Sequence, residues 1–316
     1  MVLSGVLILA TSIGTGIFVQ CAPRAITALL APTSTATPTP TSTPTRTPTL
    51  TPLPSPTLTL TPEIIEPQDH YWLRRPFSMA DNNEPTRFYP YGSTAGGRYR
   101  IHHGADFPNP FGTQVVAPAR GRVIAAGADD RTIYGERIGF YGQLVIIQLE
   151  QEYRGQKVHV LYGHLSQVHV HFLQEVDEGD IIGEVGMSGV AIGPHLHLEV
   201  RVGENAYQDT RNPELWLRPL PGKGTIAGRL LDSQGQPIPQ HPITFHNQGP
   251  LDQRWQDVIT YPSSEVNADE EWGENFVLGD VPVGDYVVKT SVNGHVYTAE
   301  VSVTEGEISL VLIEAR

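Results

Sequence analysis

The sequence contains one cysteine, Cys21, among 316 residues, so no disulfide can form within the chain. Its folded parts must therefore be stabilised by their cores or by a bound metal. Positive charge is also scarce: 21 Lys and Arg stand against 34 Asp and Glu, which leaves a net charge of −13. Because phosphate binding needs a basic face, this balance excludes a nucleic-acid partner. The hydrophobic content of 39% is low for a chain that folds along its whole length, and 316 residues suffice for two domains and a tail.

The N-terminal stretch MVLSGVLILATSIGTGIFVQC has no charged side chain. Such an apolar segment is typical of a secretory signal, or of an anchor that needs ~20 residues to span a membrane. The basic residues that usually precede it are missing, and the nearest positive charge is Arg24, on its far side. We expect residues 1–31 to be a signal or membrane-anchor segment of an exported protein, either membrane-anchored or secreted. Cys21 is a candidate for lipidation or an inert thiol, since Gln20 and Phe18 depart from the usual lipoprotein motif.

Residues 32–62 consist almost entirely of Thr, Pro and Ser. Too few large apolar groups are present for a core, and the prolines favour extended polyproline II geometry. At ~3.1 Å per residue, this stretch could hold a domain roughly 90 Å from a membrane. We expect a disordered stalk, with or without glycans on its hydroxyl groups.

The stretch GPHLHLEVRV, residues 193–202, alternates apolar and polar residues with the period of two of a half-buried β-strand. His195 and His197 therefore point to the same face, with Cα atoms roughly 6.6 Å apart. One imidazole could bind a metal while the other stands beside it. The same spacing recurs in His169 and His171, where no carboxylate motif accompanies it, so we expect those two on a surface strand.

Upstream, Asp106 lies four positions after His102. Gly104 between them and Pro108 after them disfavour a helix, so we expect the pair on a turn that leaves a strand. Imidazole and carboxylate together suit a borderline divalent ion, and two His plus one Asp leave a fourth tetrahedral position for water, as a catalytic zinc site requires. A third isolated element, LYGHLS, supplies His164.

Seven segments, in this order, resemble the lysostaphin/LytM-type zinc endopeptidases that cut peptidoglycan cross-bridges. They are HHGADF, APARGRVIAAG, YGQLVIIQ, LYGHLS, EGDIIGEVGMSG, GPHLHLEV and RNPELWL, within about residues 85–218. The resemblance implies that His102, Asp106 and His197 are ligands of one Zn²⁺ per chain, and that His164 and His195 are the catalytic pair. All five residues are present, which favours an enzyme over a scaffold with a vestigial site.

Short apolar runs separated by glycines predict an all-β module over residues 63–221. The resemblance implies an antiparallel two-sheet β-sandwich of the LytM/duplicated-hybrid-motif type, with a groove floored by the metal. Residues 128–139 are predicted to form a loop that flanks this groove, and loops are expected to set specificity. The candidates for substrate contact are Tyr89, Tyr91, Tyr99 and Arg100, although aromatics there could equally cover the edge of the core.

A bound zinc can lower the pKa of a water ligand to about 7 and polarise a scissile carbonyl. His164 and His195 could then take the proton or hydrogen-bond the oxyanion, and the sequence leaves open which does which. Glu199 could orient His197, but an exposed strand charge is the favoured interpretation.

Residues 222–316 follow a short linker that contains Pro219, Pro221 and Gly222, and again alternate strands with Gly, Pro and Asp turns. They resemble carboxypeptidase-regulatory-like, transthyretin-type domains, which implies an Ig/transthyretin-like β-sandwich and no chemistry. His241, His246 and His295 lack ligand spacing and are expected on the surface.

The leading hypothesis is an exported zinc metalloendopeptidase that hydrolyses peptide bonds in peptidoglycan stem peptides or cross-bridges. Its partners would be peptidoglycan peptides and, through the N-terminal segment, the cell membrane. Two alternatives stay open: a surface-binding or scaffold protein with a vestigial metal site, and a zinc peptidase of other extracellular proteins.

Overall fold

The computed structural model describes residues 68–248, 253–262 and 264–316, and the regular secondary structure in this part of the chain is almost entirely β-strand. Its helical elements are two single turns of 3-10 helix, η1 (Tyr207–Asp209) and η2 (Pro213–Leu215). The predicted β class is therefore confirmed. The predicted segments 1–31 and 32–62, with Cys21, lie outside the described residues. In the described part, no helix is long and apolar enough to cross a membrane.

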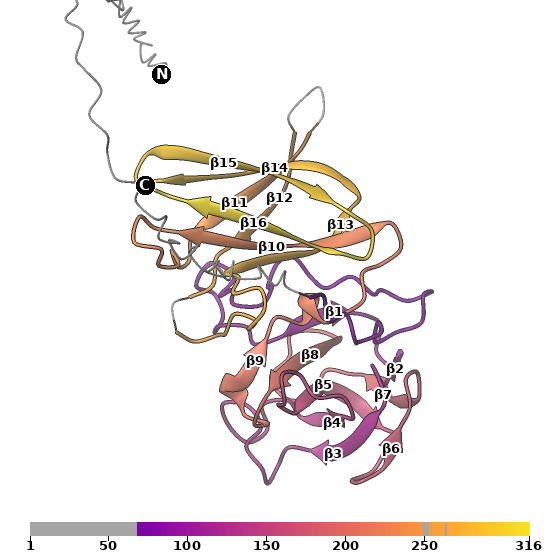
Figure 1. Ribbon diagram of the computed structural model, residues 1–316. Coiled ribbons are helices and arrows are strands. Elements are labelled where there is room, and N and C mark those ends of the chain that lie inside the picture. The colour runs from indigo at the N-terminus through magenta and orange to yellow at the C-terminus, as the bar shows by residue number, and fades with distance from the viewer. Residues whose placement is uncertain (1–67, 249–252, 263) are drawn as a thin grey trace, which may run out of the picture. The chain divides into compact units, whose positions relative to one another are not determined.

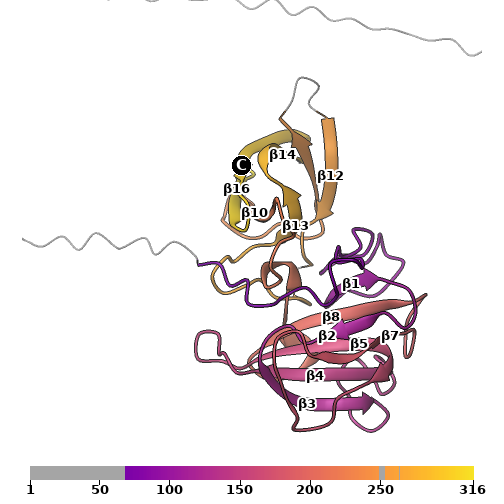
Figure 2. The same cartoon turned by 90° about the vertical axis from the view of Figure 1, so that its right-hand side faces the viewer.

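Nine strands before residue 222 are joined by hydrogen bonds into one sheet (Figures 1 and 2). They are β1 (Ala105–Pro108), β2 (Gln114–Val116), β3 (Gly121–Ala128), β4 (Gln143–Leu149), β5 (Val158–Val168), β6 (Glu175–Val176), β7 (Ile181–Val185), β8 (His195–Val202) and β9 (Thr210–Arg211). The main path runs β1-β8-β5-β4-β3-β6, while β7 pairs with both β2 and β5 and β9 pairs with β8. Every pairing in this sheet is antiparallel. The long strand β5 thus links the two groups of strands, and β8 lies between β1 and β5.

Strand β8 is buried on both faces from Leu196 to Val202, contrary to the half-buried strand that its sequence predicts. Its apolar side chains lie in the core with those of β5, as the period of two predicts. Its polar side chains face the opposite way and are also covered, because the connection between β3 and β4 places Tyr141 against Glu199 and Arg201. The face of β8 that carries polar residues in the sequence is therefore a buried polar layer in the structure.

The strands after residue 222 form two further sheets, drawn in orange and yellow in Figure 1. The three-stranded sheet has the order β13-β10-β16 and the four-stranded sheet the order β12-β11-β14-β15. Their bounds are β10 (Lys223–Leu231), β11 (Pro242–Asn247), β12 (Gln253–Ile259), β13 (Phe276–Pro282), β14 (Gly284–Val292), β15 (His295–Val303) and β16 (Ile308–Glu314). Strands β10 and β16 pair in parallel. A hydrophobic cluster contains side chains of both sheets, for example Ile226 and Phe245.

Apolar packing continues across the predicted boundary at residues 221/222. One cluster of buried side chains contains Leu73 and Phe107 together with Trp272 and Val277. Residues 63–316 also form one compact unit. The division into 63–221 and 222–316 stays a prediction, and the shared cluster means that each part covers apolar surface of the other.

Candidate metal centre and groove

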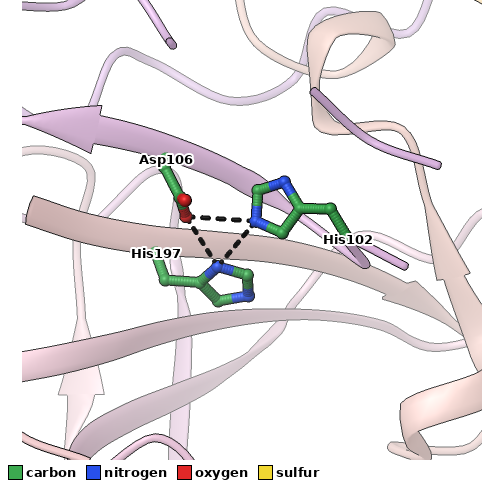
Figure 3. A group of neighbouring side chains, drawn as sticks. All are labelled: His102, Asp106 and His197. Carbon is green, nitrogen blue, oxygen red and sulfur yellow. Dashed lines mark hydrogen bonds and ion pairs between the residues drawn. The ribbon is translucent and has the colours of Figure 1, made fainter. Parts of the chain in front are cut away.

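Three potential ligand atoms converge on one point, as Figure 3 shows. His102 Nε2 lies 3.1 Å from Asp106 Oδ1 and 3.1 Å from His197 Nδ1, and His197 Nδ1 lies 2.8 Å from Asp106 Oδ1. All three residues are largely buried. The structure therefore brings together the three residues that the sequence predicts as metal ligands.

The pairing of β1 with β8 creates this convergence, because Asp106 lies directly opposite His197 in the antiparallel register. His102 lies just before β1, and Asp106 lies within it. The predicted turn leaving a strand is thus wrong: the pair enters a strand. Gly104 between them allows the close approach, since a Cβ there would lie 2.4 Å from the Leu198 carbonyl oxygen and 2.8 Å from the His197 ring.

The second nitrogen of each imidazole is already committed. His102 donates from Nδ1 to the carbonyl of Tyr89 at 2.6 Å, and His197 donates from Nε2 to Glu199 at 3.0 Å. Each ring is thereby fixed in the tautomer that leaves a lone pair pointing at the shared position. Two imidazole nitrogens and one carboxylate oxygen form a donor set that fits a borderline divalent cation such as Zn²⁺.

The charge distribution also favours a cation. Burial opposes ionisation of Asp106, but His102 and His197 hold the pKa of its carboxyl well below the usual range. Burial likewise lowers the pKa of His197, yet its hydrogen bonds to Asp106 and Glu199 raise that pKa to about 9. The cluster thus stabilises a positive charge at this position, which either a proton or a metal ion provides.

Glu199 is fully buried, so the favoured interpretation of an exposed strand charge is wrong. It accepts hydrogen bonds from Tyr141 Oη at 2.5 Å and from Arg201 Nε at 2.8 Å, besides the one from His197. Burial raises its pKa, but Arg201 and His197 outweigh that effect and lower it to about 2. Glu199 therefore presents a permanent carboxylate to the outer nitrogen of His197. The alternation that places His195 and His197 on one face of the strand also places Glu199 and Arg201 on that face. It does not predict that Tyr141 covers them.

His164 and His195 lie beside the three converging atoms, with ring centroids 4.9 Å apart. His164 donates from Nδ1 to the carbonyl of Ser188 at 2.8 Å, and His195 does so to Gly193 at 2.9 Å. In the neutral form of each ring, Nε2 is therefore the nitrogen that carries the lone pair. Burial, with the neighbouring imidazoles of His197 and His195, lowers the pKa of His164 to about 3, so this ring stays neutral. His164 is held in strand β5 with a left-handed φ of 62°.

These five residues line a cavity of about 710 Å³. Tyr89, Tyr99 and Arg100 also line it, and the Tyr89 ring stacks on His102 at 4.2 Å between centroids. Tyr91 does not reach the cavity, because its side chain is 3% exposed and its hydroxyl donates to the Thr210 carbonyl at 2.8 Å.

None of the other lining residues was predicted to contact substrate. They are Thr86, Phe88, Arg98, Ile101, His103, Pro108, Phe140, Val190, Ile192, Gly193, Pro194, Glu199 and Tyr207. Phe140 lies just after the predicted loop of residues 128–139, whose Glu136 pairs with Arg100. Exposed Ile192, four residues after Ser188 and three before His195, could have been suspected as part of a groove rim. Tyr207 gives no signal in the sequence.

Residues 100–209 match the model of Peptidase family M23. An uncharacterized metalloprotease of Haemophilus influenzae is 33% identical over 136 residues, which are 43% of this chain and 25% of that protein. The peptidoglycan DD-endopeptidase ShyA of Vibrio cholerae is 31% identical over 136 residues, 43% of this chain and 26% of that protein. The solved catalytic domain of lysostaphin from Staphylococcus simulans is 28% identical, with 41% of this chain and 86% of that domain covered, at a TM-score of 0.32. The chain spans about a quarter of the length of these two curated relatives. The residues that match the model of Peptidase family M23 thus hold the His–Asp–His cluster, the histidine pair and most of the cavity wall.

Proposed function

We propose that the protein is an exported zinc-dependent endopeptidase that hydrolyses peptide bonds in the stem peptides or cross-bridges of peptidoglycan. The convergence of His102 Nε2, Asp106 Oδ1 and His197 Nδ1 beside the imidazoles of His164 and His195 in one cavity carries this proposal. Peptidase family M23 is a family of zinc metallopeptidases, and one relative is named as a peptidoglycan endopeptidase.

His102, Asp106 and His197 would hold one zinc ion. The ion would supply a Lewis acid for the scissile carbonyl and would lower the pKa of a water bound to it. Glu199 keeps the outer nitrogen of His197 protonated and so keeps the inner lone pair directed at the cation. Asp106, also ionised, partly neutralises the charge of that cation.

His164 and His195 are positioned for proton transfer and oxyanion stabilisation. Each has its Nδ1 proton engaged by a carbonyl and its Nε2 available as a base. A neutral imidazole can accept the proton of an attacking water and, once protonated, donate to the tetrahedral oxyanion or to the leaving amine. We assign both residues to these two roles without dividing the roles between them.

The domain organisation is proposed chiefly from the sequence. Residues 1–31 would be the signal or membrane-anchor segment, with Cys21 available for lipidation, and 32–62 the stalk. Residues 63–221 would carry the peptidase in a sandwich whose two layers are the two groups of strands that β5 links into one continuous sheet, and 222–316 would form an Ig/transthyretin-like sandwich. The facing three- and four-stranded sheets with a common core support the last assignment.

Dye release from purified, dye-labelled cell walls tests the activity. The 316-residue chain loaded with zinc should release dye from walls of at least one bridge type, and the Asp106→Ala chain should not. Cleavage of extracellular proteins with no dye release from any wall would favour the general peptidase. Binding to walls with neither activity would favour the scaffold hypothesis.

A further inference from the structure

A segment of residues 264–275, between β12 and β13, contacts the short segment 207–211 that follows β8. The side-chain amide of Asn267 donates to the carbonyl of Gln208 at 2.7 Å and to the carbonyl of Thr210 at 3.0 Å. Glu270 pairs with Arg211, whose Nε donates to it at 3.1 Å. Asn267 and Glu270, which lie more than 50 residues away in sequence, thus make both polar contacts to segment 207–211.

The phenol of Tyr91 completes the attachment. Its hydroxyl donates to the Thr210 carbonyl at 2.8 Å and accepts from the backbone N–H of Asn267 at 3.2 Å. The ring packs on Tyr261 at 5.3 Å between centroids. Tyr91 therefore connects the two segments through a buried hydroxyl.

Segment 207–211 forms part of the cavity wall. Tyr207 lines the cavity, and its ring lies 4.0 Å from that of His103, which also lines it. His103 Nδ1 in turn lies 3.0 Å from Thr210 Oγ1. A shift of Thr210 would therefore displace the His103 and Tyr207 rings together.

The local structure of this segment is weak. Helix η1 is a single 3-10 turn with no side-chain hydrogen bond at its N-cap and no buried residue. Strand β9 has two residues, and it pairs with β8 through Thr210 and Arg211. Such a short element has little stability of its own, so its position depends on outside contacts.

We propose that Asn267 is a positioning residue, through which the C-terminal strands hold Tyr207 in the wall of the substrate groove. The statement that this cavity binds substrate rests on the proposed function. The contact between Asn267 and segment 207–211 does not depend on any activity. It gives residues 222–316 a role in substrate binding, exerted through segment 207–211, without a contact of their own to the reacting atoms.

Hydrogen exchange of the full 316-residue chain tests the attachment without any substrate. Asn267→Ala should accelerate exchange in peptides that cover 206–212 by roughly five-fold or more, the effect of one net hydrogen bond. Arg154→Ala is the matched control, since it removes the 2.5 Å pair with Glu271 in the same segment and leaves 207–211 untouched. Glu270→Gln should produce a smaller acceleration at the same peptides. Equal exchange in Asn267→Ala and Arg154→Ala would overturn the proposal.

Steady-state kinetics on a soluble cross-linked peptide test the link to the groove. Asn267→Ala should raise KM by roughly five-fold and leave kcat and zinc content near those of the unsubstituted chain. In a Tyr207→Ala chain the same substitution should have no further effect on KM, because the residue through which it acts is gone. Additive effects of the two substitutions would overturn the link. An inactive unsubstituted chain would refute the proposed function, and the exchange experiment would still decide the attachment.

Discussion

Among the described residues, two buried clusters that combine histidine with aspartate can be compared. One lines the cavity, and the other does not. In the first, Asp106 lies 2.8 Å from His197 and 3.1 Å from His102. In the second, Asp269 Oδ2 lies 3.0 Å from His70 Nε2, and both side chains are almost fully buried. Residue types and distances alone would not separate them.

The partners of the second cluster come from within the chain, and neither His70 nor Asp269 lines the cavity. Asp269 Oδ1 accepts from the Tyr153 hydroxyl at 3.0 Å and from the backbone N–H of Glu271 at 2.9 Å. The His70 ring packs against Trp216 at 4.4 Å between centroids. In the first cluster, by contrast, three lone pairs converge beside a cavity, and the outer nitrogens are the ones engaged. The first cluster therefore differs from the second in having three converging donor atoms next to a cavity, and this difference supports the proposed metal site.

The strongest test of this comparison removes one carboxylate from each cluster. Asp106→Ala should lose stoichiometric zinc and all measurable hydrolysis, because it removes one of the three proposed ligands and one of the two carboxylates that contact His197. Asp269→Asn should keep one zinc per chain, since its cluster offers no converging lone pairs. Elemental analysis of the two purified chains measures this difference. Full zinc occupancy in the Asp106→Ala chain would refute the ligand assignment.

A second test separates the proposed zinc ligands from the proposed catalytic pair beside them. His197→Ala should lose metal and activity together. His195→Ala and His164→Ala should retain most of the zinc while kcat falls by ~100-fold or more, the usual contribution of proton transfer. Zinc titration and single-substrate kinetics on each variant distinguish the outcomes. A His195→Ala chain without zinc, alongside a His197→Ala chain that keeps it, would reverse the two roles.

Much of this site could be predicted from sequence because strand alternation fixes which side chains share a face. The HxH spacing placed His195 and His197 together, and HxxxD supplied the partners across β1 and β8. The covering of Glu199 could not be predicted, because Tyr141 reaches it from a loop between β3 and β4, 58 residues away in sequence. A polar side chain on a strand looks the same whether it faces water or an internal network.

The role of Tyr91 was missed for a related reason. An aromatic residue shortly before a ligand suits a groove wall as well as a core, and only its partners decide. Those partners include Asn267, which lies beyond the predicted boundary at 221/222. A Pro- and Gly-rich linker indicates where a chain can turn, but it does not report whether the flanking strands pack on each other. The boundary itself stays a prediction that expression of residues 63–221 would test.

The last test addresses the second cluster. Glu274 adjoins it: its carboxylate accepts from the Asp269 backbone N–H at 2.9 Å and from the Tyr261 hydroxyl at 3.1 Å. Burial raises the pKa of Glu274 from 4.5 to about 8, so the folded chain holds a proton that the unfolded chain releases above pH 4.5. Its stabilising contribution is thus complete below pH 4.5 and is lost as pH rises toward 8.

We therefore expect the free energy of unfolding to fall between pH 5 and pH 8 by at most about 1.4 kcal/mol per pH unit through this group. Glu274→Gln, which stays neutral at both pH values, should remove that share of the slope and leave zinc content unchanged. Asp269 does not interfere, because His70 and the Glu271 backbone N–H outweigh burial and lower its pKa below 3.8, so its contribution is lost only in more acidic solution. Urea unfolding of both chains at pH 5 and pH 8 measures the difference. Parallel slopes for the two chains would show that Glu274 is already ionised in the folded protein, and that Tyr261 and Asp269 then hold a buried charge in place of a proton.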